Sequence, residues 1–76
     1  MPALIFDPDA LRRIRRAKGL SQSALGERVG RSVAAVSRWE SQVNAPDLSV
    51  IDSLATALGV DFMELTTRSS RQAVAA

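Results

Sequence analysis

The side chains in this chain that could do chemistry are arginines, hydroxyls and amides rather than nucleophiles or metal ligands. Its 76 residues include ten Lys or Arg and eight Asp or Glu, but no Cys and no His. This composition excludes disulfides, thiol nucleophiles, the usual zinc ligands and most catalytic dyads and triads. No cluster of carboxylates stands out to replace them. We therefore expect no catalytic residue, no metal and no cofactor, and we interpret the chain as a binding protein rather than an enzyme.

The charged residues are separated along the chain. Residues 12–40 hold eight Lys or Arg against two Glu, a net charge of +6, whereas residues 41–66 hold four acidic residues and no Lys or Arg, a net charge of −4. This separation predicts that one end of the domain faces a polyanion while the other faces solvent or a partner. A solvated basic face without a ligand explains the charge equally well, so charge alone leaves both interpretations open.

Four helices are predicted from the residues at their ends. Each begins after a short polar side chain that can accept a hydrogen bond from a free backbone N–H, and three of them stop at a glycine. The predicted capping residues are Asp7, Ser21, Ser32 and Asp47, and the predicted closing glycines are Gly19, Gly30 and Gly59. Apolar side chains recur at helical spacing in the first and fourth segments, and we expect them to face the core. They are Leu11, Ile14 and Ala17 in the first, and Leu48, Ile51, Leu54, Ala55 and Leu58 in the fourth.

The end of the chain predicts a fifth, shorter helix followed by a tail. Asp61 and Glu64 have the spacing of a capping box. Residues 67–76 show neither caps nor a sustained period, so we expect them to be flexible. Apart from residues 3–6, which could be extended, no segment indicates a strand. The length allows one small domain, and the longest apolar runs are too short for a membrane span or a signal peptide.

Residues 20–40, LSQSALGERVGRSVAAVSRWE, read as two short helices joined by a tight turn. Gly30 can take the left-handed conformation that the turn needs, and Gly26 lies where the next helix must cross closely. In the second of these helices Val36 and Trp39 are predicted to face inward. The residues predicted to face outward are Val33, Ala34, Ser37 and Arg38. Two helices in this arrangement predict a helix-turn-helix, whose second helix is shaped to enter the major groove of DNA.

Over residues 11–65 the order of residues resembles the Cro/C1-type (Xre-like) helix-turn-helix family. The resemblance implies an all-α, five-helix lambda-repressor-like domain over residues 7–66, an N-terminal extension over 1–6 and a flexible tail over 67–76. It also implies a cytoplasmic, sequence-specific regulator of transcription that binds double-stranded DNA. We expect a repressor that acts as a homodimer on a palindromic operator.

The resemblance places the base-facing positions at Val33, Ala34, Ser37 and Arg38. Arg38 can grip a guanine through O6 and N7, and Ser37 can bond a base edge or a phosphate. Val33 and Ala34 replace polar side chains that are common in the family. They can contact thymine methyl groups. The alternative is that they are small residues of the kind common on exposed helix surfaces, without a role in binding.

The expected contacts to the DNA backbone come from polar side chains around the same helix. The resemblance implies that Gln22 bonds a phosphate and braces the start of the recognition helix. The simpler interpretation is that Gln22 is a polar side chain exposed to solvent at the start of a helix. The other candidates are Ser32, Ser41, Asn44, Arg15 and Arg16. Family members often have Gly at the place of Gln42, and we expect Asn44 to provide the left-handed residue that lets the turn form.

Five residues are predicted to be architectural, namely Gly26, Gly30, Val36, Trp39 and Glu40. The resemblance implies that Glu40 pairs with Arg15, which would neutralise a carboxylate close to DNA. For dimerisation we expect Phe62 and Met63 to supply the contact, with the segment Leu4-Ile5-Phe6 as the second candidate. A different class of function stays open: an antitoxin or adaptor whose acidic, apolar C-terminal third binds a protein, with DNA binding used for autoregulation.

Overall fold

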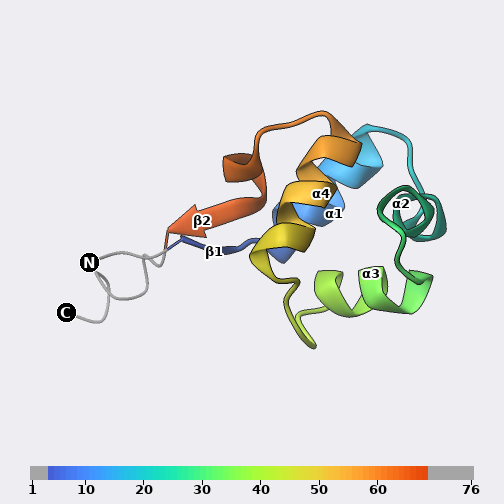
Figure 1. Ribbon diagram of the computed structural model, residues 1–76, viewed down its shortest axis with the longest axis horizontal. Coiled ribbons are helices and arrows are strands. Elements are labelled where there is room, and N and C mark those ends of the chain that lie inside the picture. The colour runs from blue at the N-terminus through green and yellow to red at the C-terminus, as the bar shows by residue number, and fades with distance from the viewer. Residues whose placement is uncertain (1–3, 69–76) are drawn as a thin grey trace.

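A computed structural model describes residues 4–68 as a small helical domain with one short sheet (Figure 1). Its elements are β1 (Leu4–Phe6), α1 (Pro8–Ala17), α2 (Gln22–Val29), α3 (Val33–Glu40), α4 (Leu48–Leu58), a 3-10 helix η1 (Phe62–Leu65) and β2 (Thr66–Arg68). The predicted helical fold is confirmed, with four α-helices instead of five. Across residues 4–68, no helix has both the length and the apolar character that a membrane span requires.

Every α-helix begins at the capping residue that the sequence predicts. The side chains of Asp7, Ser21 and Ser32 accept hydrogen bonds of 3.0–3.1 Å from the backbone N–H three residues later. Asp47 accepts from the Val50 N–H at 3.0 Å. This bond, together with a bond from the Ser49 hydroxyl, holds the pKa of Asp47 below its ordinary value. These local bonds satisfy N–H groups that have no partner inside the helix.

The predicted fifth α-helix is wrong in type, because residues 62–65 form a single 3-10 turn and the Asp61 side chain makes no capping hydrogen bond. The chain then continues into β2, which pairs antiparallel with β1 in the register Leu4↔Arg68, Ile5↔Thr67 and Phe6↔Thr66. Parts of the expected N-terminal extension and of the expected tail therefore join in one sheet. Their remaining residues, 1–3 and 69–76, lie outside the described part of the chain.

The core is aliphatic apart from Trp39, and it gathers side chains from all four α-helices and η1. Two residues that we expected inside are exposed instead, namely Ala17 and Leu48. Ala17 is the last residue of α1 and Leu48 is the first of α4, so each lies at an end of its helix. Ala10 and Val50 are buried although neither belonged to the predicted stripes.

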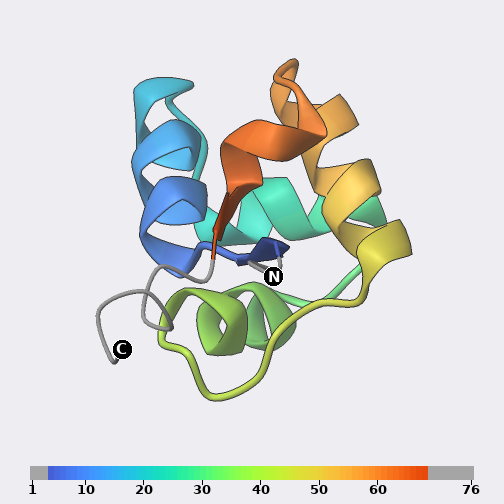
Figure 2. The same ribbon diagram turned by 90° about the vertical axis from the view of Figure 1, so that its left-hand side faces the viewer.

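The arrangement leaves α3 accessible along one side of the molecule. In Figure 1, α2 and α3 lie toward one end, while β1, β2 and η1 lie toward the other. Figure 2 looks onto that second end and shows the sheet, η1 and the loop that connects α3 to α4 on one face. The core thus supports α3 from behind, and the loop after α3 leads directly to the face that carries the sheet.

Candidate nucleic-acid interface

The two sides of α3 have different chemistry. Val36, Trp39 and Glu40 are buried against the rest of the domain, as predicted for architectural residues. The predicted base-facing residues, Val33, Ala34, Ser37 and Arg38, are all exposed. The open side of this eight-residue helix therefore presents two small apolar side chains near its start, with a hydroxyl and a guanidinium further along.

The turn between α2 and α3 is fixed by close backbone packing. Gly30 has φ 70°, and the Arg31 N–H donates to the Gly26 carbonyl at 2.8 Å. A Cβ atom on Gly26 would lie 2.7 Å from the Arg31 carbonyl oxygen, a distance that real contacts do not tolerate. Gly26 is thus required by space and Gly30 by backbone conformation, which sets the angle at which α3 leaves the turn.

A buried ion pair ties the last residue of α3 to α1. Arg15 Nε donates to Glu40 Oε2 at 2.6 Å and Arg15 Nη2 donates to Glu40 Oε1 at 3.0 Å. The remaining guanidinium nitrogen, Nη1, donates to the Leu20 carbonyl at 2.7 Å. The pair that the resemblance implies is present, and it is a fork of two parallel bonds that fixes geometry as well as charge.

The ionisation of this pair follows from its hydrogen bonds. Burial by itself raises the pKa of Glu40, but the bonds from Arg15 and Gln22 and the charge of Arg15 outweigh it, so the pKa lies below its ordinary value. The bond to Glu40 likewise raises the pKa of Arg15, against the opposing effect of burial. Both side chains are therefore charged in the folded protein.

Two predicted backbone contacts have other roles in the structure. Arg15 is buried and each of its guanidinium nitrogens donates one hydrogen bond, to Glu40 or to Leu20, so its main role in the structure is to anchor Glu40. Gln22 Nε2 donates to Glu40 Oε1 at 3.1 Å. Gln22 therefore braces the end of α3 rather than its start, while its second amide N–H remains a potential donor.

Four predicted backbone contacts remain, namely Ser32, Ser41, Asn44 and Arg16. Ser32 accepts the capping bond through Oγ, so its hydroxyl proton can still be donated. The Ser41 hydroxyl instead donates to the Ser37 carbonyl at 2.9 Å, which uses its proton within α3. Asn44 and Arg16 are exposed. The left-handed residue in the loop is Gln42, with φ 67°, and not Asn44 as we expected.

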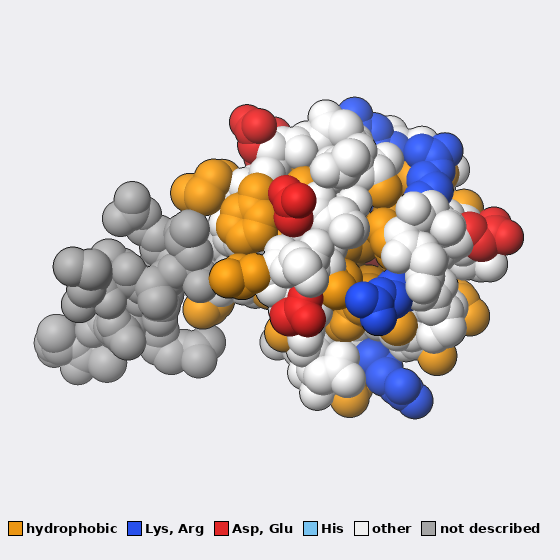
Figure 3. Space-filling view, viewed as in Figure 1, with side chains coloured by type: hydrophobic (Ala, Val, Ile, Leu, Met, Phe, Trp, Pro, Cys, Tyr) orange, Lys and Arg blue, Asp and Glu red, His pale blue; other side chains and the backbone are white. Residues whose placement is uncertain are grey.

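Positive charge gathers on the same part of the molecule as α2 and α3. In Figure 3 most of the blue side chains lie toward those helices, whereas most of the red ones lie over α4 and η1. Arg12 forms an exposed ion pair with Asp9 at 2.8 Å. Among the cations whose exposure the structure describes, the exposed ones are Arg13, Arg16, Lys18, Arg28, Arg31 and Arg38. The exposed cations thus lie on or just after α1, on α2, in the α2–α3 turn and on α3, and Arg31 and Arg38 directly flank or belong to α3, where they suit a polyanion.

The residues expected to mediate dimerisation lie at the opposite end. Met63 is exposed, but Phe62 is half-buried and packs against the core. Phe62 therefore contributes mainly to folding, because most of its ring is already covered within one copy of the chain.

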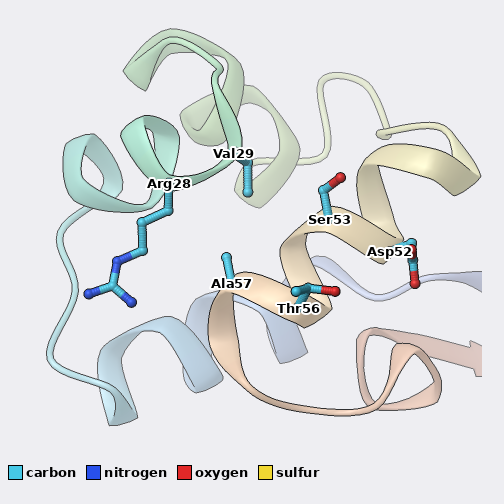
Figure 4. Close-up of a pocket in the computed structure, with 6 residues that line it drawn as sticks. All are labelled: Arg28, Val29, Asp52, Ser53, Thr56 and Ala57. Carbon is cyan, nitrogen blue, oxygen red and sulfur yellow. The ribbon is translucent and has the colours of Figure 1, made fainter.

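A hollow of about 330 Å³ lies between α2 and α4 (Figure 4). Arg28 and Val29 line it from α2, and Asp52, Ser53, Thr56 and Ala57 line it from α4. The Arg28 guanidinium extends away from the carboxylate of Asp52, so the charged groups do not converge on one point. Residues 4–68 also contain no group of three or more Asp or Glu placed to hold a metal ion.

Comparison with known proteins agrees with this geometry. A protein-family model described as helix-turn-helix matches residues 11–65. A search of curated proteins found no match. Among solved structures, the restriction-modification controller protein C.AhdI from Aeromonas hydrophila is 38% identical with a TM-score of 0.74, over 76% of this chain and 84% of its own.

Two further solved structures have similar architecture. The P22 c2 repressor, crystallised with a synthetic operator, is 31% identical with a TM-score of 0.72, over 76% of this chain and 88% of its own. The hypothetical transcription factor NHTF from Neisseria is 29% identical with a TM-score of 0.75, over 91% of this chain and 79% of its own. Sequence and fold therefore agree, and the chain belongs to the Cro/C1-type helix-turn-helix family of DNA-binding transcriptional regulators.

Proposed function

We propose that this protein represses transcription by occupying a palindromic operator as a homodimer, with α3 of each copy in the major groove. The observation that carries the proposal is the division of α3: one side is locked to the core by Val36, Trp39 and Glu40, and the other side is open and flanked by cations. A helix held in this way can enter the groove without rearranging.

The named relatives support the finer parts of the proposal. The P22 c2 structure is that of a repressor bound to an operator, and C.AhdI is a controller protein. A dimer is favoured because one eight-residue helix contacts only a few base pairs. Two copies on a palindrome place their recognition helices about 34 Å apart, one turn of DNA. The enlarged interface provides the affinity that a monomer lacks.

Within each half-site, the side chains divide into two kinds of contact. Arg38 and Ser37 donate to base edges, while Val33 and Ala34 pack against thymine methyl groups. The backbone contacts come from the second N–H of Gln22, the Ser32 hydroxyl, Asn44 and Arg16, and they hold the register without reading sequence.

The experiment that tests this assignment compares Arg38→Ala with Gln22→Ala on a duplex selected from random sequences. Loss of a guanine contact should cost about 1–3 kcal/mol on the preferred duplex and remove discrimination at one base pair per half-site. Gln22→Ala should weaken preferred and altered duplexes by similar factors, because a phosphate contact carries no base identity. A uniform loss for Arg38→Ala on all sequences would make Arg38 a backbone contact.

The same titrations should be repeated at several salt concentrations. Affinity of the wild-type protein should fall steeply as salt rises, because bound cations displace counterions from DNA. Failure to select any duplex, or binding that is independent of salt, would contradict the proposal as a whole.

A further inference from the structure

The hollow between α2 and α4 combines an apolar floor with charged groups at its edges. Val29 and Ala57 are half-buried and point toward each other from the two helices (Figure 4). Arg28 and Asp52, by contrast, are exposed, and they lie on opposite sides of that floor. Neither of them takes part in an ion pair within residues 4–68. Both charges are therefore available to a ligand.

The hydrogen-bonding groups of the hollow are separated by type. The hydroxyls of Ser53 and Thr56 lie on the same side of the floor as Asp52 (Figure 4). Ser53 donates its proton to the Ser49 carbonyl at 3.1 Å, which leaves its oxygen as an acceptor. The Arg28 guanidinium, on the other side, has only N–H donors. One end therefore offers mainly acceptors and a negative charge, and the other offers donors and a positive charge.

We propose that this hollow binds a small zwitterion, with its carboxylate at Arg28, its ammonium group at Asp52 and a short apolar spacer over the floor. A simple anion is attracted by Arg28 but repelled by Asp52, and a simple cation is affected in the reverse way. A zwitterion is attracted at both ends. The flat guanidinium matches a carboxylate through two parallel bonds. An ammonium group supplies three donors, which Asp52 and the neighbouring hydroxyl oxygens can accept.

The size and position of the hollow suit a small molecule that does not compete with DNA. Its volume of about 330 Å³ lies at the lower end of the range for ligand sites, roughly 300–1,000 Å³. All six lining residues belong to α2 or α4. A ligand in the hollow therefore leaves the open side of α3 uncovered.

The α2 side of the hollow leads directly into the turn that positions α3. Val29 is the last residue of α2, and Gly30 follows it as the left-handed residue of the turn. Because the hollow is present in the arrangement in which α3 is open, a ligand bound there stabilises that arrangement. Ligand binding and DNA binding should then strengthen each other. This effect on DNA binding rests on the proposed function, whereas the binding of the zwitterion does not.

Linear ω-amino acids are the probes for the binding site, because they differ only in the separation of their two charges. The series is glycine, β-alanine, γ-aminobutyrate and ε-aminocaproate. Two-dimensional amide NMR of the wild-type protein without DNA should show shifts at residues 28–29 and 52–57, with the tightest binding at one chain length. Butyrate and butylamine each lack one charge. They should bind about two- to fivefold more weakly than γ-aminobutyrate, as expected for the loss of one exposed ion pair.

A charge substitution tests whether the two ends of the hollow bind separate groups. Asp52→Lys places a cation at each end, so this variant should prefer glutarate, which has two carboxylates, over γ-aminobutyrate. The wild-type protein should show the opposite preference. Asp61→Lys is the matched control, because it makes the same change of charge at an exposed residue outside the hollow whose side chain caps no helix. It should keep the wild-type preference, and circular dichroism checks that both variants fold.

Two results of these titrations would overturn the binding site. One is the absence of shifts at residues 28–29 and 52–57 with every member of the series. The other is an Asp52→Lys protein that folds and keeps the wild-type preference, which would show that Asp52 does not contact the ligand.

Titrations of a selected duplex then test the effect on DNA binding. Saturation with the tightest-binding ω-amino acid should raise the DNA affinity of the wild-type protein by about fivefold or more, and should leave that of Asp52→Lys unchanged. Equal affinity of the wild-type protein with and without the ligand would overturn the coupling to α3. If the NMR shifts are present but no duplex is bound, the proposed function is wrong and the zwitterion site stands.

Discussion

The two ends of α3 are held by different physical means. At its start, the turn from α2 packs so closely that a Cβ on Gly26 would lie 2.7 Å from the Arg31 carbonyl oxygen. At its end, Glu40 is anchored inside the domain, yet the next residues are exposed and the left-handed position is occupied by Gln42. The start is restricted by close backbone packing, whereas the end is fixed by the buried Arg15–Glu40 pair and is followed by exposed residues.

The other helices show what is unusual at the end of α3. All four α-helices close with the same two bonds, from the left-handed residue to the carbonyl three positions back and from the next residue to the carbonyl five positions back. Gly19, Gly30 and Gly59 occupy the left-handed position in α1, α2 and α4. Gln42 occupies it in α3, with Val43 N donating to the Arg38 carbonyl at 3.0 Å. A residue with a side chain thus occupies, at the end of α3, the left-handed position that glycine fills in the other three helices.

The largest effect is expected from breaking the anchor inside the domain. Glu40→Ala would leave the Arg15 guanidinium buried without its partner, and should destabilise the fold by about 3–5 kcal/mol. Urea denaturation followed by circular dichroism measures this change. Arg12→Ala, which breaks the exposed pair with Asp9, is the control and should cost less than about 1 kcal/mol. Equal effects of the two substitutions would show that burial of the Arg15–Glu40 pair has no energetic consequence.

Gly26→Ala should have the next largest effect. In an ordinary exposed helix this change adds about 1 kcal/mol of stability. Here the new methyl group meets backbone rather than a movable side chain, so we expect a loss of about 1–3 kcal/mol. The control is Ser23→Ala, an exposed position in the same helix, which should change stability by less than about 0.5 kcal/mol. A stabilised Gly26→Ala protein would contradict the space restriction at the start of α3.

Gln42→Gly should act in the opposite direction. Removing the side chain relieves the left-handed strain, and we expect a gain of about 1 kcal/mol in the free energy of unfolding. Gln42→Ala keeps a Cβ in the same conformation and should leave stability nearly unchanged. Thermal or urea unfolding of both variants separates the effect of the backbone from that of the amide. A loss of stability in Gln42→Gly would mean that the Gln42 side chain makes compensating contacts.

The smallest effect is expected from acid. Because the pKa of Glu40 is lowered in the folded state, its contribution is present above the ordinary value of 4.5 and is lost as pH falls through the lowered pKa. Glu40→Gln removes the titrating group. The free energy of unfolding of the wild-type protein should therefore decline more than that of Glu40→Gln between about pH 6 and pH 3, the range in which carboxylates titrate. Urea midpoints at each pH measure this difference. Parallel curves would show that Glu40 does not contribute to the acid dependence.

The features that the sequence predicted correctly depend on residues close together in the chain. A cap acts over three residues, and the left-handed glycines follow their helices directly, so Asp47 and Gly59 could both be identified from local order. The buried Arg15–Glu40 pair spans distant residues, and only the family resemblance implied it. The bond from Gln22 to the end of α3 was missed because it depends on how α2 lies across α3.

Three further features were not predicted, for different reasons. Pairing of β1 with β2 joins opposite ends of the described chain, and neither segment carries a strand pattern strong enough to predict it alone. Leu48 matched the apolar spacing of α4, but periodicity cannot show that the first turn of α4 extends beyond the core. The left-handed conformation of Gln42 was not predicted, because propensity favours Asn at such a position. The position is set by where α3 ends, and Gln42 is the residue that stands there.

The sheet also has a consequence for the order in which the molecule folds. Its register connects residues 4–6 with residues 66–68, so it can form only after nearly the whole described chain has been brought together. The helices and their caps need only near neighbours, and such local contacts generally form earlier than distant ones. We expect Thr67→Gly to accelerate unfolding while leaving the refolding rate almost unchanged. Stopped-flow measurements over a range of urea concentrations would show this, and slower refolding would instead place the sheet in the folding transition state.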